Sequence, residues 1–148
     1  MDAFPFSTDE WQRVNDVSRK VVNASFMDDG VLGQSHLLEL TSVLDELRKR
    51  HGEHPILLET EADFLQDATV RVAKYRLAIA LAKQHNLSSY TVRLSLAYVL
   101  FEQLSDAAQA ICELNVCEDE VGQLGDDWEN KQWQELMAKC RMRQSFET

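Results

Sequence analysis

Residues 55–85, PILLETEADFLQDATVRVAKYRLAIALAKQH, and residues 88–114, SSYTVRLSLAYVLFEQLSDAAQAICEL, decide the fold. Apolar residues recur in both stretches at steps of three and four, which is typical of amphipathic helices. A shift of 35 positions superposes three pairs of identical residues: Ala62 and Ala97, Leu65 and Leu100, and Ala73 and Ala108. A period in the thirties predicts stacked helix pairs, because each pair must bury its apolar face against its neighbours.

The composition favours the same class of fold. The chain has 148 residues, of which 45% are hydrophobic and 27% charged, as in an ordinary globular protein. It contains only 5 glycines and 2 prolines, whereas a β-sandwich needs many turn residues. We therefore expect a single all-α domain over residues 1–148.

Charge and targeting signals limit the cellular locations and the classes of partner that we expect. The net charge is −10, which argues against free nucleic acid and anionic membranes as partners. The first residues show neither a basic segment nor an apolar run after it, so we expect no signal peptide, and no apolar run in the sequence reaches membrane-spanning length. The three cysteines form no disulfide framework, so we expect a cytoplasmic protein.

Capping signals place the ends of about seven helices. Ser7 and Glu10 have capping-box spacing, and Phe6 and Trp11 can form a hydrophobic staple beside it. The later predicted caps are Asp67, either Ser105 or Asp106, and Asp126 together with Glu129. These signals predict hairpins over about 8–51, 55–85 and 88–116, followed by a C-terminal capping helix over about 126–145.

Three further expectations concern elements inside these hairpins. Residues 28–35 and the acidic residues 117–126 are expected to be connections, since each contains two glycines. The helix that Asp67 caps is rich in alanine, with an expected apolar face at Val70, Ala73, Leu77, Ala80 and Leu81. Because small residues allow close helix packing, we expect this helix to be the central one.

The runs YRLAIALA (75–82) and LSLAYVL (94–100) resemble tetratricopeptide repeats (TPRs). The residues that match the family's small and apolar positions are Ala62, Ala97, Leu65 and Leu100 in the first helices, and Ala73, Ala80 and Ala108 in the second. The chain departs from the family in its period of 35 and in residues 66–68 and 103–105, which replace the usual Gly and Tyr of the turn. The resemblance covers about 65 residues closely and about 45 loosely.

This resemblance implies a right-handed stack of antiparallel helical hairpins. It also implies a concave groove, lined by the first helix of each pair, that binds a peptide or protein segment. Tyr98 is a groove residue on this basis, together with Asp63, Gln66 and Arg93; the alternative for Tyr98 is a packed core aromatic. Trp128 lies off the apolar stripe of the last helix, and an exposed tryptophan is typical of an interface.

The charge layout gives a second set of candidates. Residues 68–101 contain five basic residues and no acid, whereas residues 94–130 contain nine acids and no base. Reversing Arg71, Lys74 and Arg76 is expected to weaken partner capture if this bipolar surface steers a partner. The alternative is that the same charges, with those of Arg93, pair within the fold or solvate convex faces.

The sequence shows little catalytic or metal chemistry. His51 and His54 straddle a helix end, and we expect no metal there. Cys112 and Cys140 are expected to be buried hydrophobes, and the acids around Cys117 should raise the pKa of its thiol. Glu59, Glu61 and Asp63 alternate along a helix, and steps of two do not converge into a carboxylate pair.

These observations favour a protein–protein interaction module, either an adaptor or a chaperone-like carrier, rather than an enzyme, with no cofactor. The first alternative is a structural module that forms a homodimer through its last helix or the helix around residues 90–104. The second is a small helical enzyme or a ligand carrier.

Overall fold

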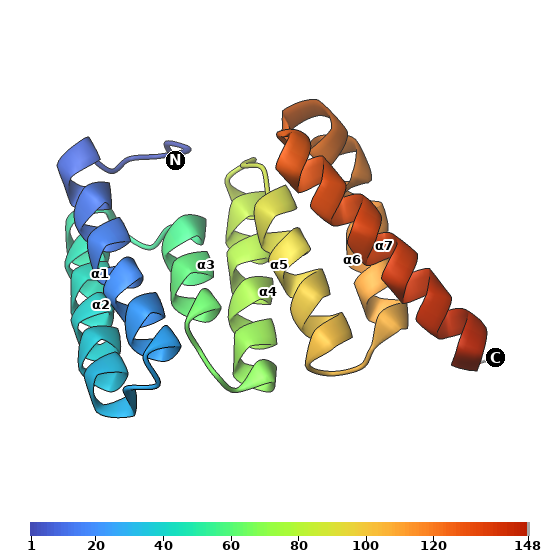
Figure 1. Cartoon of the computed structure of the whole chain (residues 1–148). Coiled ribbons are helices and arrows are strands. Elements are labelled where there is room, and N and C mark those ends of the chain that lie inside the picture. Colours follow the sequence, from blue (N-terminus) through green and yellow to red (C-terminus); the bar gives the residue numbers. More distant parts are fainter. Residues whose placement is uncertain (148) are drawn as a thin grey trace. The chain divides into compact units, whose positions relative to one another are not determined.

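The computed structural model describes residues 1–147, and this part of the chain contains seven α-helices and no strand. The helices are α1 (Thr8–Phe26), α2 (Gly30–His51), α3 (Pro55–Asp63), α4 (Ala68–Gln84), α5 (Tyr90–Glu102), α6 (Ala107–Leu124) and α7 (Asp127–Glu147) (Figure 1). The predicted all-α fold with a C-terminal helix is confirmed.

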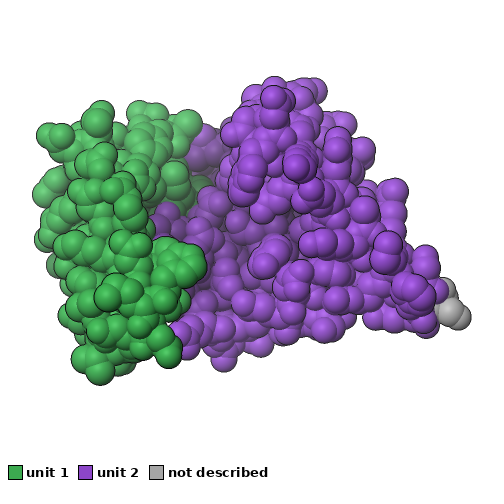
Figure 2. Space-filling view, in the orientation of Figure 1, with its two compact units in different colours: residues 1–57 green, residues 58–148 purple. Residues whose placement is uncertain are grey.

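Packing divides the chain into two compact units, residues 1–57 and residues 58 onward (Figure 2). The division falls inside α3, between Leu57 and Leu58. The sequence, in contrast, predicts one domain over residues 1–148.

The first unit is a helical hairpin in which α1 packs against α2. The capping box at Ser7 and Glu10 is present, and the rings of Phe6 and Trp11 stack with centroids 5.3 Å apart. The predicted connection over 28–35 is wrong, since α2 already begins at Gly30. The reason is that the Asp29 side chain accepts a hydrogen bond from the backbone N–H of Leu32 and starts the helix early.

The second unit has two rows of neighbouring helices. Glu59 of α3 accepts a hydrogen bond from Thr91 of α5, and Tyr90 of α5 donates one to Glu129 of α7. These contacts place α3, α5 and α7 in one row. Arg76 of α4 pairs with Glu113 of α6, so α4 and α6 form the second row. This is the arrangement expected of stacked hairpins.

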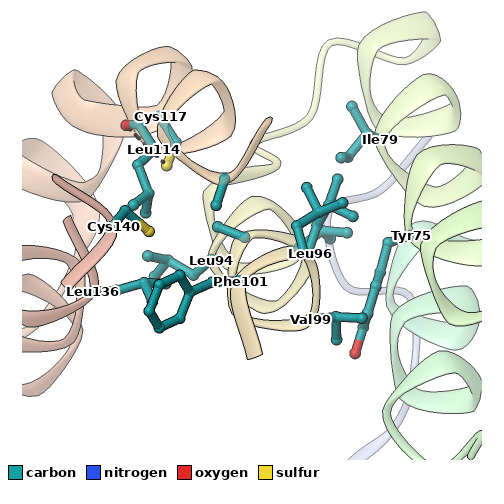
Figure 3. Packing of buried hydrophobic residues seen from close by; sticks show 14 of the residues in the cluster. Tyr75, Ile79, Leu94, Leu96, Val99, Phe101, Leu114, Cys117, Leu136 and Cys140 are labelled. Atoms are coloured by element: carbon teal, nitrogen blue, oxygen red, sulfur yellow. Dashed lines mark hydrogen bonds between the residues drawn. The ribbon is translucent and has the colours of Figure 1, made fainter. Parts of the chain in front are cut away.

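The central helix is α5, not α4 as predicted. Leu94 and Phe101 face Leu136 and Cys140 of α7, whereas Leu96 and Val99 face Tyr75 and Ile79 of α4 (Figure 3). Seven of the thirteen residues of α5 are buried. The expected apolar face of α4 is turned outward, with Leu77 59% exposed. Alanine and leucine occur on both sides of α4, so the composition of this helix does not identify its buried face, and the predicted face is wrong.

The 35-residue register holds only for the first helices of the repeats. The starts of α3 and α5, Pro55 and Tyr90, are 35 positions apart, and buried Ala62 aligns with buried Ala97. The caps of α4 and α6, Asp67 and Asp106, are 39 positions apart. The difference arises because α5 has 13 residues and α3 has 9, which is about one helical turn.

Residues 117–124 continue α6, which corrects the predicted acidic loop. Leu114, Cys117 and Val121 are buried at steps of three and four, so the apolar stripe runs through this segment. The acids Glu118 and Asp119 lie on the exposed side of the helix. Asp126 and Glu129 then form the predicted capping box of α7.

Candidate partner-binding groove

A groove of about 320 Å³ lies between α5 and α7 in the second unit. Its lining residues are Tyr98 and Glu102 of α5, and Trp128, Lys131, Gln132, Glu135, Leu136 and Lys139 of α7. Tyr98 is 48% exposed and Trp128 68% exposed, so two large aromatic side chains meet solvent at the same groove. Of the two predictions for Tyr98, the structure favours the groove over the core.

The packing of α5 and α7 explains why these side chains face outward. On α7, Leu136, Met137 and Cys140 are buried against the rest of the second unit. The indole N–H of Trp133 donates a hydrogen bond of 2.8 Å to the carbonyl oxygen of Leu114 and fastens α7 to α6. With this face buried, the face that carries Trp128 is left at the surface.

One arginine holds the C-terminal part of α7 against α5. Arg143 Nη1 donates a hydrogen bond of 2.9 Å to the carbonyl oxygen of Phe101. The Arg143 guanidinium carbon also lies 3.8 Å from the centroid of the Phe101 ring, which is a cation–π contact. Both walls of the groove are therefore supported by specific contacts.

The N-terminal end of α5 lies between carboxyl groups of two other helices. Thr91 Oγ1 donates to Glu59 Oε2 at 3.3 Å, and the Tyr90 hydroxyl donates to Glu129 Oε1 at 3.3 Å. Burial raises the pKa of Glu59 to about 7, and the negative charges of Asp63 and Glu129 add to this increase. Burial, with the charge of Glu129, also raises the pKa of Tyr90.

The alternating acids of α3 include one pair that lies on a common helix face. Glu59 and Glu61, two positions apart, do not converge, but Glu59 and Asp63 are four apart and share a helix face. Asp63 is accordingly the charge that contributes most to the raised pKa of Glu59. A search for i, i+4 pairs in the sequence would have found it.

Two of the predicted basic residues pair inside the fold. Arg76 Nη1 and Arg93 Nη1 lie 3.2 Å and 2.6 Å from the two carboxylate oxygens of Glu113. Glu113 is only 8% exposed. The structure therefore places both arginines in a structural ion-pair network, as the alternative interpretation of the charge layout expected.

Arg71 and Lys74 are also engaged locally. Arg71 donates to the carbonyl oxygen of Ala62 at 3.0 Å and to the hydroxyl of buried Tyr75 at 3.1 Å. The Tyr75 hydroxyl in turn donates to Asp63, and Lys74 binds Glu61. These contacts join α3 to α4.

Gln66 and the three cysteines complete the list of sequence candidates. Gln66 is exposed in the connection between α3 and α4. Cys112 is exposed, which contradicts its expected burial, because Ala110 and Glu113 occupy the inner face of α6 there. Cys140 is buried as predicted. The pKa of Cys117 is raised to about 11, chiefly by burial and only secondarily by nearby acids.

Both histidines near the end of α2 have protein partners. His51 Nε2 lies 3.0 Å from Glu10 Oε2. His54 Nδ1 accepts the backbone N–H of Ile56 at 3.2 Å, so its Nε2–H is the donor to the carbonyl oxygen of Asp2 at 3.0 Å. These contacts tie the N-terminal segment to the start of α3 within the first unit.

Most of the groove lining was missed by sequence reasoning. Only Tyr98 and Trp128 were predicted. The signal for the remainder is helical spacing: steps of three and four from Trp128 along α7 reach Lys131, Gln132, Glu135 and Lys139, and Glu102 is four residues after Tyr98 on α5.

Comparison of the chain with protein-family models, curated proteins and solved structures finds no match in any of the three. Within residues 1–147, every helix is too short or too polar to span a bilayer.

Proposed function

We propose that this chain is a protein–protein interaction module that holds an apolar or amphipathic segment of a partner in the groove between α5 and α7. The observation that carries the proposal is the exposure of Tyr98 and Trp128 on the lining of one groove of about 320 Å³. Exposed aromatic side chains beside a concave surface are typical of binding hot spots.

The repeat-like arrangement supports this proposal. The groove lies between α5 and α7, which belong to the row that contains the first helices of the predicted repeats. We further propose that the chain is TPR-like, with its helical hairpins stacked in a right-handed superhelix. We also propose a cytoplasmic location, which the three free thiols of Cys112, Cys117 and Cys140 support.

Capture from a native lysate of the source tests the proposal. The immobilised chain is compared with variants Tyr98→Ala and Trp128→Ala, and with Leu77→Ala, which removes an exposed apolar side chain from α4 instead. We expect a stoichiometric partner that the first two variants lose and the Leu77→Ala control retains. Retention by all variants would contradict the groove as the binding site.

Self-association is the second candidate function. Met142 and Phe146 are 64% and 86% exposed near the end of α7. A dimer through α7 would cover both side chains. Light scattering over a range of concentrations distinguishes the two functions: a tight dimer that Phe146→Ser converts to a monomer would favour self-association.

A further inference from the structure

The outward face of α7 carries a regular stripe of exposed side chains. Leu136, Met137 and Cys140 are buried and define the inner face of this helix. On the opposite side, exposed residues follow one another at alternating steps of three and four, which is the spacing of a coiled-coil seam. A stripe with this period meets a second helix along its whole length, about 30 Å for the 21 residues of α7. The stripe consists of Trp128, Lys131, Glu135, Ala138, Met142 and Ser145.

Large apolar side chains stand at both ends of this face. Trp128 near the start of α7 is 68% exposed, and Met142 and Phe146 near its end are 64% and 86% exposed. Trp128 and Phe146 are 18 positions apart, which is about 27 Å along the helix. A helical segment that covers both ends therefore needs a similar length and apolar side chains at a matching spacing.

The charges of α7 divide between its two halves. Residues 127–135 contain three acids and one base, which is a net charge of −2, and residues 139–147 contain three bases and one acid, which is a net charge of +2. Two such helices attract each other when they are antiparallel, whereas a parallel pair would place like charges together. The face of α7 is therefore complementary in charge to a second copy of itself.

One antiparallel register satisfies the apolar ends and the charges together. If two α7 helices cross at position 137, Trp128 of each copy lies opposite Phe146 of the other, since both residues are nine positions from the crossing. In the same register Glu135 lies opposite Lys139, because both are two positions from the crossing. Ala138, beside the crossing, has a short side chain that allows the two helices to approach closely.

The charged pair of this register belongs to the groove between α5 and α7, because Glu135 and Lys139 both line it. Within one copy, Glu135 Oε1 lies 3.9 Å from Lys131 Nζ, and both side chains are more than half exposed. A long ion pair in solvent contributes little energy. Glu135 can therefore exchange this partner for a lysine of a second copy at little cost.

We infer that the segment held in the groove is the α7 helix of a second copy of this chain, which runs antiparallel to the first. In this two-fold symmetric dimer, Trp128 packs against Phe146 of the second copy, and Glu135 pairs with Lys139 of the second copy. Each copy supplies one helix and receives the other, so the groove and the exposed end of α7 belong to one interface. The inference names the partner in the proposed function and therefore rests on that function.

Sedimentation equilibrium of the full chain over a wide range of concentrations tests the inference. We expect a reversible dimer with twice the 17.0 kDa mass of one chain. Trp128→Ser and Phe146→Ser should each weaken the dimer about tenfold or more, because each removes an apolar anchor from both ends of the interface. Leu77→Ser, which changes an exposed apolar residue of α4, is the matched control and should leave the dimer unchanged.

Charge reversal tests the register. Glu135→Lys and Lys139→Glu should each weaken the homodimer about tenfold, because like charges then face each other at two places in the interface. An equimolar mixture of the two variants should recover dimerisation, since opposite charges again face each other between the copies. Recovery on mixing cannot arise within one helix, because mixing leaves each chain unchanged.

Spin labels measure the orientation of the two helices. A label at Glu147→Cys, combined with Cys112→Ser to remove the exposed thiol, lies ten positions from the crossing in each copy. The two labels should be about 30 Å apart along the helices in an antiparallel dimer and about 10 Å apart in a parallel one. The short distance would overturn the inference.

The outcomes separate the inference from the proposed function. If the chain stays monomeric, but Tyr98→Ala and Trp128→Ala lose a lysate protein that Leu77→Ala retains, the groove binds another protein and the inference is wrong. If the chain stays monomeric and no such protein is captured, both are overturned. A dimer that survives Trp128→Ser, Phe146→Ser and the charge reversals would also overturn this interface.

Discussion

Glu113 of α6 shows how one buried carboxylate organises the second unit. It is 8% exposed and lies beside Arg76 of α4 and Arg93 of α5. A buried ion pair does not by itself stabilise a protein more than apolar packing does, but removal of one partner leaves charge uncompensated. The pairing therefore gives a structural role to two of the five basic residues in the middle of the chain, Arg76 and Arg93.

We predict that Glu113→Gln lowers the free energy of unfolding by about 1–3 kcal/mol, because it leaves Arg76 and Arg93 without their carboxylate. The estimate is below the usual range for a buried pair since the Arg76 side chain is 45% exposed. Urea unfolding followed by circular dichroism measures the change. Glu118→Gln on the exposed side of α6 is the control, and an equal loss in both variants would contradict the network.

Glu10 provides a pH-dependent prediction at the residue scale. Its pKa is lowered to about 2, first by the hydrogen bond from the Ser7 backbone and then by His51 and Arg50. A lowered pKa in the folded state gives stability that is present above the ordinary value of 4.5 and is lost as the pH falls toward 2.

The expected result is that wild-type protein loses stability more steeply than Glu10→Gln over this acidic range. Thermal unfolding at a series of pH values from 5 to 2 measures the difference between the two proteins. Parallel curves would show that Glu10 does not contribute to the pH dependence.

Individual helices begin where a side chain can cap them. Asp67 and Asp106 accept from the backbone N–H groups of Val70 and Gln109 at 3.1 and 3.0 Å. Of the two predicted caps for α6, the structure selects Asp106. Ser105 instead has a φ of 53°, which places it in the left-handed region before the helix starts.

At the scale of this element, Asp106→Ala should lower the free energy of unfolding by about 1 kcal/mol, because the N-terminal N–H groups of α6 lose their acceptor. Ser105→Gly removes the neighbouring hydroxyl but suits the positive φ, so it should be neutral or slightly stabilising. Chemical denaturation of both variants measures the two effects. A larger loss in Ser105→Gly than in Asp106→Ala would contradict the assignment of the cap.

Charge acts at the scale of the whole molecule through its net value of −10. If the partner segment is basic, this field speeds its diffusional encounter, and salt screens the field beyond about 10 Å at 0.1 M. We therefore predict that the association rate with a lysine-rich amphipathic peptide falls about tenfold between about 0.02 and 0.2 M NaCl. Stopped-flow fluorescence measures this rate, and a rate independent of salt would contradict electrostatic steering.

The local features of the chain were largely determined by its sequence. Capping at Ser7, Asp67 and Asp126 depends on residues three or four positions apart, and hydrogen-bond geometry over that range is set by the backbone. The all-α class follows for the same reason, since helical periodicity is a short-range pattern. The exposure of Trp128 was predicted because it lies off the stripe of its helix.

Only the tertiary structure decided which helix is central, which face of α4 is buried and where the groove lies. Leucine and alanine occupy both faces of α4, so its buried side depends on contacts with α5. The groove likewise combines α5 and α7, whose nearest lining residues, Glu102 and Trp128, are 26 positions apart, and the raised pKa of Glu59 depends on Glu129, which is 70 positions away. Such sites depend on which helix faces meet when the helices pack. Apolar residues at steps of three and four along one helix do not specify which face of another helix they will contact.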